Sequence, residues 1–186
     1  MTDTKVQFPD VSRFSAVDEI QRPQQLIEVL DVAKRLPGFS AAKTQLLDWL
    51  GPEHASAAID VGCGYGADVI ELAERLRPSG RATGVDLSEA MITEARRRTA
   101  GISADVSFQV ADALALPFAD STFDISRTET VLQHLADPAA AVSEMARVTR
   151  PGVGGSARSS STRTPCSSIT LMSSCSTHCG TRLAAP

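Results

Sequence analysis

The sequence predicts an α/β fold in which parallel strands alternate with helices. Four short apolar runs, each typical of a buried parallel strand, are separated by segments whose apolar residues recur at helical spacing. The first run ends in three closely spaced glycines, an arrangement typical of a tight turn between a strand and a helix. The chain has 186 residues, of which 42% are hydrophobic and 22% charged, which excludes a fibrous or wholly disordered protein.

Residues 1–50 are expected to form a helical unit ahead of the sheet. Apolar residues follow the helical period over 20–36 and again over 41–50. No run approaches the ~20 apolar residues that cross a bilayer, and the first ten residues lack the apolar core of a secretory signal. We therefore expect a cytoplasmic protein without membrane association.

Strands and helices are expected to alternate through residue 151. The expected strands are 57–61, 81–85, 106–110 and 123–127, and the expected helices are 67–76, 89–98 and 138–149. Ser88 is the expected N-cap of the second helix, and Asp137 caps the third, which begins with proline. Such alternation produces right-handed βα units and a parallel sheet with flanking helices.

The composition changes near residue 152. Residues 152–186 hold three arginines, no acidic residue, 14 serines and threonines and no aromatic residue. Such a segment has little apolar surface to offset the entropy of ordering it. We expect a disordered tail over 152–186, so that the sheet is truncated after its fourth strand and the following helix.

A shift of reading frame is one hypothesis for this change. If Ser159, Ser160 and Ser161 use TCN codons, a shifted frame reads NTC, which always encodes Phe, Leu, Ile or Val. The shifted frame would then encode an apolar strand in place of the serines. A genuine divergent tail is the alternative.

The turn after the first strand carries the most informative motif. Gly62, Gly64 and Gly66 follow a G-x-G-x-G spacing, and Asp60 lies two residues before them. A dinucleotide-binding turn has G-x-G-x-x-G spacing, and a pyrophosphate seeks helix N–H groups rather than a carboxylate. The motif therefore disfavours NAD(P), and Asp60 suits a ligand that carries an ammonium group. A turn that binds no ligand is the alternative.

Two further acids follow the next two strands. Asp86 ends the second strand, 24 residues after Gly62, near the ~20-residue offset of an acid that accepts hydrogen bonds from ribose hydroxyls. Asp112 follows the third strand, where a carboxylate can accept a hydrogen bond from an adenine amino group. Open α/β sheets bind ligands at the carboxyl edge, where all three acids should meet. The alternatives are a helix cap for Asp86 and a solvated loop acid for Asp112.

Four segments carry a family resemblance: AAIDVGCGYGADVIELA, GVDLSEAMITEAR, FQVADALALPFADSTFDI and LQHLADPAAAVSEMARVTRPG. Together they resemble the successive motifs of class I S-adenosylmethionine-dependent methyltransferases, in the small-molecule branch that includes ubiquinone/menaquinone-biosynthesis enzymes. The match covers about residues 40–152. It implies a Rossmann-like sheet of strand order 3-2-1-4-5-7-6 within 51–151, helices over 1–50 that cap the acceptor pocket, and S-adenosyl-L-methionine as cofactor.

The resemblance also implies cofactor contacts from the ends of four successive strands. For the methionine end of the cofactor these are Asp60, Gly62, Gly64, Gly66 and Thr128. For the ribose and the adenine they are Asp86, Leu87, Asp112 and Ala113.

Two residues near the end of the fourth strand can take part in the chemistry. Methyl transfer from a sulfonium depends on positioning and electrostatics, and many acceptors also need a general base. His134 is the candidate base, and a role in shaping its loop is the alternative. Arg127 is an unexpected charge on a buried strand. It would bind an acidic group of the substrate or cofactor, or pair with Glu129 or Asp124.

The sequence indicates neither a metal site nor a nucleic-acid or membrane partner. Cys175, His178 and Cys179 lack the second, distant pair of a zinc site. A formal net charge of −4 gives no bulk attraction to nucleic acid or an anionic membrane. We predict methyl transfer to a small-molecule acceptor. The alternatives are an inactive truncated remnant that at most binds cofactor or a partner chain, and an NAD(P)-dependent oxidoreductase.

Overall fold

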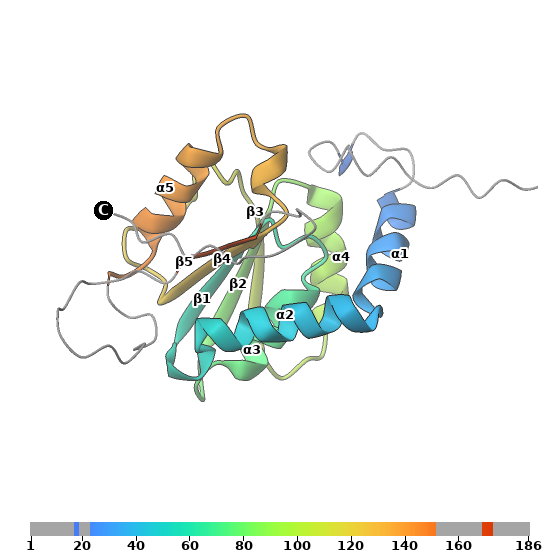
Figure 1. The fold of residues 1–186 in the computed structure, drawn as a ribbon, viewed down its shortest axis with the longest axis horizontal. Coiled ribbons are helices and arrows are strands. Elements are labelled where there is room, and N and C mark those ends of the chain that lie inside the picture. The colour runs from blue at the N-terminus through green and yellow to red at the C-terminus, as the bar shows by residue number, and fades with distance from the viewer. Residues whose placement is uncertain (1–16, 19–22, 152–168, 173–186) are drawn as a thin grey trace, which may run out of the picture.

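A parallel sheet runs through the middle of the molecule, with helices on both of its faces (Figure 1). The computed structural model describes residues 17–18, 23–151 and 169–172. The strands are β1 (Ala57–Val61), β2 (Arg81–Asp86), β3 (Asp105–Val110), β4 (Ile125–Glu129) and β5 (Ile169–Met172). Their order is β3-β2-β1-β4-β5, and every neighbouring pair is parallel. The predicted α/β class is confirmed, as is the order of the first four strands.

The helices begin and end close to the positions that their caps predict. They are α1 (Pro23–Lys34), α2 (Pro37–Leu50), α3 (Ala67–Arg75), α4 (Glu89–Thr99) and α5 (Pro138–Val148). The Ser88 side chain accepts a hydrogen bond from the Met91 N–H, and the Asp137 side chain accepts one from the Ala140 N–H. Both predicted N-caps are confirmed.

Helix α2 differs from its predicted bounds. Helix α2 begins at Pro37, four residues earlier than expected, because proline at the first helical position needs no N–H partner. Its C-cap is Gly51, whose φ of 62° is the left-handed conformation that glycine adopts most readily. None of the helices in the described part of the chain is long and apolar enough to cross a membrane.

Strand β4 begins two residues later than expected. Phe123 forms an isolated parallel bridge with Thr149 rather than with β1, and regular pairing of β4 with β1 starts at Ile125. The Asp124 carboxylate accepts hydrogen bonds from the N–H groups of Ser56 and Ala57, and the Asp124 N–H donates to the Ala57 carbonyl. Asp124 therefore anchors the start of β1.

The four strands β1 to β4 form the predicted parallel sheet, and four residues of the tail lie beside β4 as a short fifth strand. Ile169–Met172 pairs in parallel with Ser126–Glu129 of β4. The edge of a sheet presents unpaired N–H and C=O groups, and this segment contains apolar and β-branched residues that favour strands. The position of β5 matches the order 3-2-1-4-5 that the resemblance implies. The prediction of disorder for 152–168 and 173–186 lies outside the described residues.

Side chains that alternate along the strands build a core on each face of the sheet. The face covered by α2, α3 and α4 buries Leu47, Leu50, Ala58, Val69, Leu72, Ile92, Ala95, Phe108 and Ile125. The face covered by α5 and the loop before β4 buries Ile59, Val61, Val85, Leu116, Phe123, Met145 and Val148. This packing fixes the carboxyl ends of β1, β2 and β4 side by side.

Candidate functional site

The three glycines after β1 have different structural reasons for being glycine. All have positive φ values, 75° at Gly62, 54° at Gly64 and 79° at Gly66. A Cβ atom at Gly62 would lie 2.0 Å from a methyl group of Val131, and one at Gly66 would lie 2.5 Å from the Phe108 ring. A Cβ atom at Gly64 would meet no atom within 4 Å. Gly62 and Gly66 therefore allow close packing, whereas the backbone at Gly64 remains open to a ligand.

Asp86 joins the glycine loop to the turn after β2. Its Oδ2 accepts a hydrogen bond from the Gly64 N–H at 2.8 Å, and its Oδ1 accepts one from the Ser88 N–H at 2.9 Å. Burial raises the pKa of Asp86, and these two N–H groups oppose the rise. Ser88, not Asp86, caps α4, so the alternative of a helix cap fails. A carboxylate has about four acceptor positions, so Asp86 retains capacity for a ligand hydroxyl.

The residues that follow β2 and β3 form an exposed surface beside Asp86. Asp86 lies opposite Val110 in the sheet, and its carbonyl accepts the Ala111 N–H at 3.0 Å. Leu87 is 60% exposed, which is unusual for a large apolar side chain next to a buried strand. Asp112 is exposed, and its Oδ1 accepts a hydrogen bond from the Leu114 N–H. The structure thus brings Asp86, Leu87 and Asp112 to one edge, as predicted.

A charge cluster built around the buried pair Asp60 and Arg127 lies on the other side of the glycine loop. Asp60 and Arg127 are register partners on β1 and β4, and the Arg127 Nε lies 3.5 Å from the Asp60 Oδ1. The Arg127 Nη2 donates a hydrogen bond to Glu129 at 2.7 Å and lies 3.4 Å from Asp68 on α3. The predicted pairing of Arg127 with Glu129 is confirmed. Asp124 instead pairs with Arg150 at 2.5 Å.

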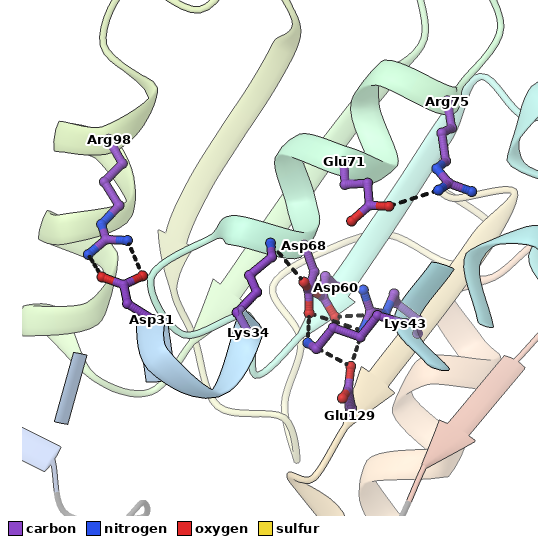
Figure 2. Close-up of polar contacts among 10 residues, drawn as sticks. Asp31, Lys34, Lys43, Asp60, Asp68, Glu71, Arg75, Arg98 and Glu129 are labelled. Carbon is purple, nitrogen blue, oxygen red and sulfur yellow. Dashed lines mark hydrogen bonds and ion pairs between the residues drawn. The ribbon is translucent and has the colours of Figure 1, made fainter. Parts of the chain in front are cut away.

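Two lysines from the N-terminal helices complete this cluster. Lys43 of α2 contacts Asp68 and lies 3.1 Å from Glu129, and Lys34 of α1 lies 3.4 Å from Asp68. Figure 2 shows Lys34, Lys43, Asp60, Asp68 and Glu129 converging from separate elements. We define the charge cluster as Lys34, Lys43, Asp60, Asp68, Arg127 and Glu129, which is three cations and three carboxylates. Sequence reasoning missed Lys34, Lys43 and Asp68, because their chemistry appears only when α1 and α2 pack over the loop.

Two carboxylates of the charge cluster have opposite pKa shifts. Burial raises the pKa of Asp60 to about 6, although the Arg127 guanidinium opposes the rise. Burial also acts on Asp68, but Arg127 and Lys43 overcome it and lower its pKa to about 2. The Nε of Arg127 is buried and donates no hydrogen bond within the described residues. Asp60 is therefore the incompletely paired carboxylate of the cluster, the one with most to gain from an added ammonium group.

Thr128 and His134 lie where the chain leaves β4. The Thr128 hydroxyl is buried and donates to the Val61 carbonyl at 2.7 Å, so it ties β4 to β1. His134 ends the 3₁₀ turn Leu132–His134, and its Nε2 lies 3.1 Å from the Gln133 amide nitrogen. Val131 packs against Gly62, which places this turn over the glycine loop. Roles for Thr128 and Ala113 in cofactor binding and for His134 as a base stay predictions.

No group of three or more His, Cys, Asp or Glu side chains in the described segments could hold a metal ion. Cys175, His178 and Cys179 lie outside those segments.

Comparison with known proteins identifies the domain that these residues build. Residues 58–152 match the family model described as a methyltransferase domain. The chain is 36% identical over 112 residues to the ubiquinone/menaquinone biosynthesis C-methyltransferase UbiE of Roseobacter denitrificans, covering 59% of this chain and 44% of that protein. It is 41% identical over 126 residues to an uncharacterized 37.1 kDa protein of a Streptomyces fradiae transposon, covering 68% of this chain and 36% of that protein.

Solved structures share the fold. A geranyl diphosphate methyltransferase in complex with GPP and sinefungin matches with a TM-score of 0.54 and 30% identity, over 61% of this chain and 42% of that one. The [4+2]-cyclase SpnF matches with a TM-score of 0.56 and 27% identity, over 61% of this chain and 42% of that one. The chain spans about two fifths of the length of the curated relatives it matches. The family match spans half the chain and holds both the glycine loop and Asp86, so this chain belongs to the family of S-adenosylmethionine-dependent methyltransferase domains.

Proposed function

We propose that this chain binds S-adenosylmethionine at the carboxyl edge of its sheet and transfers the methyl group to a small-molecule acceptor. The observation that carries the proposal is the position of Asp86. It bridges the glycine loop and the turn after β2, beside the open backbone of Gly64 and the exposed Leu87. This arrangement suits a ligand with a hydroxyl-bearing ring and a flat apolar base.

The residues of the site fit the cofactor from one end to the other. Asp86 would accept hydrogen bonds from the ribose hydroxyls, and Leu87 would cover one face of the adenine. Asp112 and Ala113 would meet the adenine edge. Asp60, the glycine loop and the region of Thr128 would hold the methionine end. There the incompletely paired Asp60 would attract the ammonium group, and the Arg127 guanidinium would offset part of the negative charge of the neighbouring carboxylates.

The bound cofactor supplies the reactive methyl group on a sulfonium, so the chain needs to supply position and electrostatics. His134, on the turn over the glycine loop, is the residue that we propose as base for acceptors that lose a proton. The fold alone does not require methyl transfer, because the cyclase SpnF shares it. The proposal of a small-molecule acceptor is supported by the names of two relatives, a geranyl diphosphate methyltransferase and UbiE.

Calorimetry with S-adenosylhomocysteine tests the cofactor site directly. We expect binding to the full chain and none with NAD. Asp86→Ala should weaken binding at least tenfold, because a half-buried acceptor for the ribose is lost. Asp105→Ala is the matched control, since Asp105 lies at the amino end of β3 and pairs with the exposed Arg81. Heat with NAD alone, or equal affinities for both variants, would contradict the proposal.

A second candidate function is an inactive domain that retains cofactor binding. The observation that favours it is the family match, which ends at residue 152, where the composition changes. Binding of S-adenosylhomocysteine without transfer to any tested acceptor would support this candidate. Sequencing the coding DNA across codons 145–165 tests the frameshift hypothesis. A missing or added base that restores an apolar strand would support it, and a confirmed frame would reject it.

A further inference from the structure

Tyr65 lies between the second and third glycines of the loop. It is buried in a small apolar cluster with Val17, Leu26, Ile27 and Met91. Leu26 and Ile27 belong to α1, and Met91 belongs to α4. The glycine loop is therefore packed directly against the N-terminal helical unit.

A polar network reinforces this contact. The Arg98 guanidinium of α4 stacks 4.3 Å from the centre of the Tyr65 ring. The same guanidinium donates to both carboxylate oxygens of Asp31 on α1, at 2.8 and 2.9 Å (Figure 2). Burial and the adjacent Asp31, its hydrogen-bond partner, raise the pKa of Tyr65. Asp31, Tyr65 and Arg98 form a triad that joins α1, the glycine loop and α4.

The N-terminal unit also contacts the turn that follows β2. Asp18 accepts hydrogen bonds from the Glu89 and Ala90 N–H groups at the start of α4, at 2.9 and 3.2 Å. Its carboxylate also accepts the Ser88 hydroxyl at 2.5 Å. The same N-terminal unit therefore contacts two segments of the proposed cofactor site, the glycine loop and the turn after Asp86.

We propose that Tyr65 is a positioning residue that couples the N-terminal helices to cofactor binding. Through the Asp31–Tyr65–Arg98 triad, docking of α1 holds the glycine loop in the conformation that receives the cofactor. The coupling is reciprocal, so bound cofactor strengthens the docking of α1. The ligand in this inference rests on the proposed function, whereas the effect of the triad on the glycine loop does not.

The chain offers a matched control within the same interface. Asp48 of α2 pairs with Arg75 at 2.6 Å, near the end of α3 that is remote from the glycine loop. This ion pair also joins the N-terminal unit to the domain. It differs from Asp31–Arg98 in having no contact with Tyr65.

The test measures binding of S-adenosylhomocysteine to the full chain by calorimetry. We expect Asp31→Ala to raise the dissociation constant about tenfold and Tyr65→Phe to raise it by a smaller factor, because the phenylalanine ring keeps the stacking. Asp48→Ala should change it less than about twofold. Equal effects of Asp31→Ala and Asp48→Ala would overturn the inference, as would an unchanged affinity in Tyr65→Phe.

Hydrogen exchange of the ligand-free chain separates this inference from the proposed function. Amides of residues 62–66 should exchange faster in Asp31→Ala and Tyr65→Phe than in the wild type, and at the wild-type rate in Asp48→Ala. If the wild type binds no S-adenosylhomocysteine, the proposed function fails while this exchange pattern still decides whether the triad holds the loop. If Asp31→Ala does not fold, Tyr65→Phe alone decides. Unchanged exchange in Tyr65→Phe overturns the inference.

Discussion

The two halves of the candidate site use their charges differently. On the β1 and β4 side, the charge cluster has a buried centre, Asp60 and Arg127, and its carboxylates lie beside cations of the chain itself. On the β2 and β3 side, Asp86 and Asp112 accept only backbone N–H groups among their described hydrogen bonds, and Leu87 and Asp112 are exposed. The first half therefore balances most of its charge within the chain and leaves Asp60 incompletely paired, whereas the second half keeps hydrogen-bond acceptors available to a ligand.

Loss of Arg127 should have the largest effect, because it breaks the buried half at its centre. Arg127→Ala removes the ion-pair partner described for Asp60 and leaves Asp68 and Glu129 with lysine partners alone. Removal of one member of a buried ion-pair network destabilises by about 3–5 kcal/mol. Urea unfolding measures the change. Arg81→Ala is the control, since its pair with Asp105 is exposed and contributes less than about 1 kcal/mol. Similar losses for both variants would contradict the distinction between the halves.

Asp60 and Asp68 should respond to pH in opposite directions. Asp60 has a pKa of about 6 in the folded state against an ordinary 3.8, so its ionisation lowers the stability of the wild type as pH rises from about 4 to 6. Asp60→Asn has no carboxylate to ionise, so its stability does not fall in this way. Relative to the wild type, its free energy of unfolding should therefore rise by about 3 kcal/mol between pH 4 and pH 7.5, at about 1.4 kcal/mol per pKa unit.

Asp68→Asn is the matched comparison. The folded pKa of Asp68, about 2, lies below 3.8, so its ionisation stabilises the folded state above pH 4, and this stabilisation disappears as pH falls toward 2. The variant should lose about 2 kcal/mol at pH 7 relative to the wild type and little at pH 2. Thermal unfolding across the pH range checks both variants. If the stability difference from the wild type changed with pH in the same direction for both variants, the ion pairs described for the charge cluster would be contradicted.

Leu87 should affect ligand binding with the smallest effect on stability. Because its side chain is already 60% exposed, Leu87→Ala should change the free energy of unfolding by no more than about 0.5 kcal/mol. The affinity for S-adenosylhomocysteine should fall about fivefold, since the proposed apolar contact with the adenine would be lost. Val32→Ala, at a position 62% exposed on α1, should change neither quantity. A stability loss without an affinity loss would show that Leu87 belongs to the core.

The open half of the site was accessible to sequence reasoning, and the buried half was not. Asp86 and Asp112 end consecutive strands, and the topology of a parallel sheet brings strand ends together whatever the side chains do. Lys43 and Asp68 lie 25 residues apart on different helices, and nothing periodic in the chain links them. Arg127 was recognisable as an unusual buried charge, but its partner Asp60 depended on the register between β1 and β4.

The sequence by itself determined the α/β class, the caps of α4 and α5, the glycine loop and the acids at the strand ends. These features depend on local periodicity, backbone freedom at glycine and the connectivity of βα units. Tertiary structure alone decided the charge cluster, the Asp31–Tyr65–Arg98 triad and the pairing of β5 with β4. These features depend on how helices and strands distant in the chain pack together, and burial of that kind sets the partners and the pKa values of charged side chains.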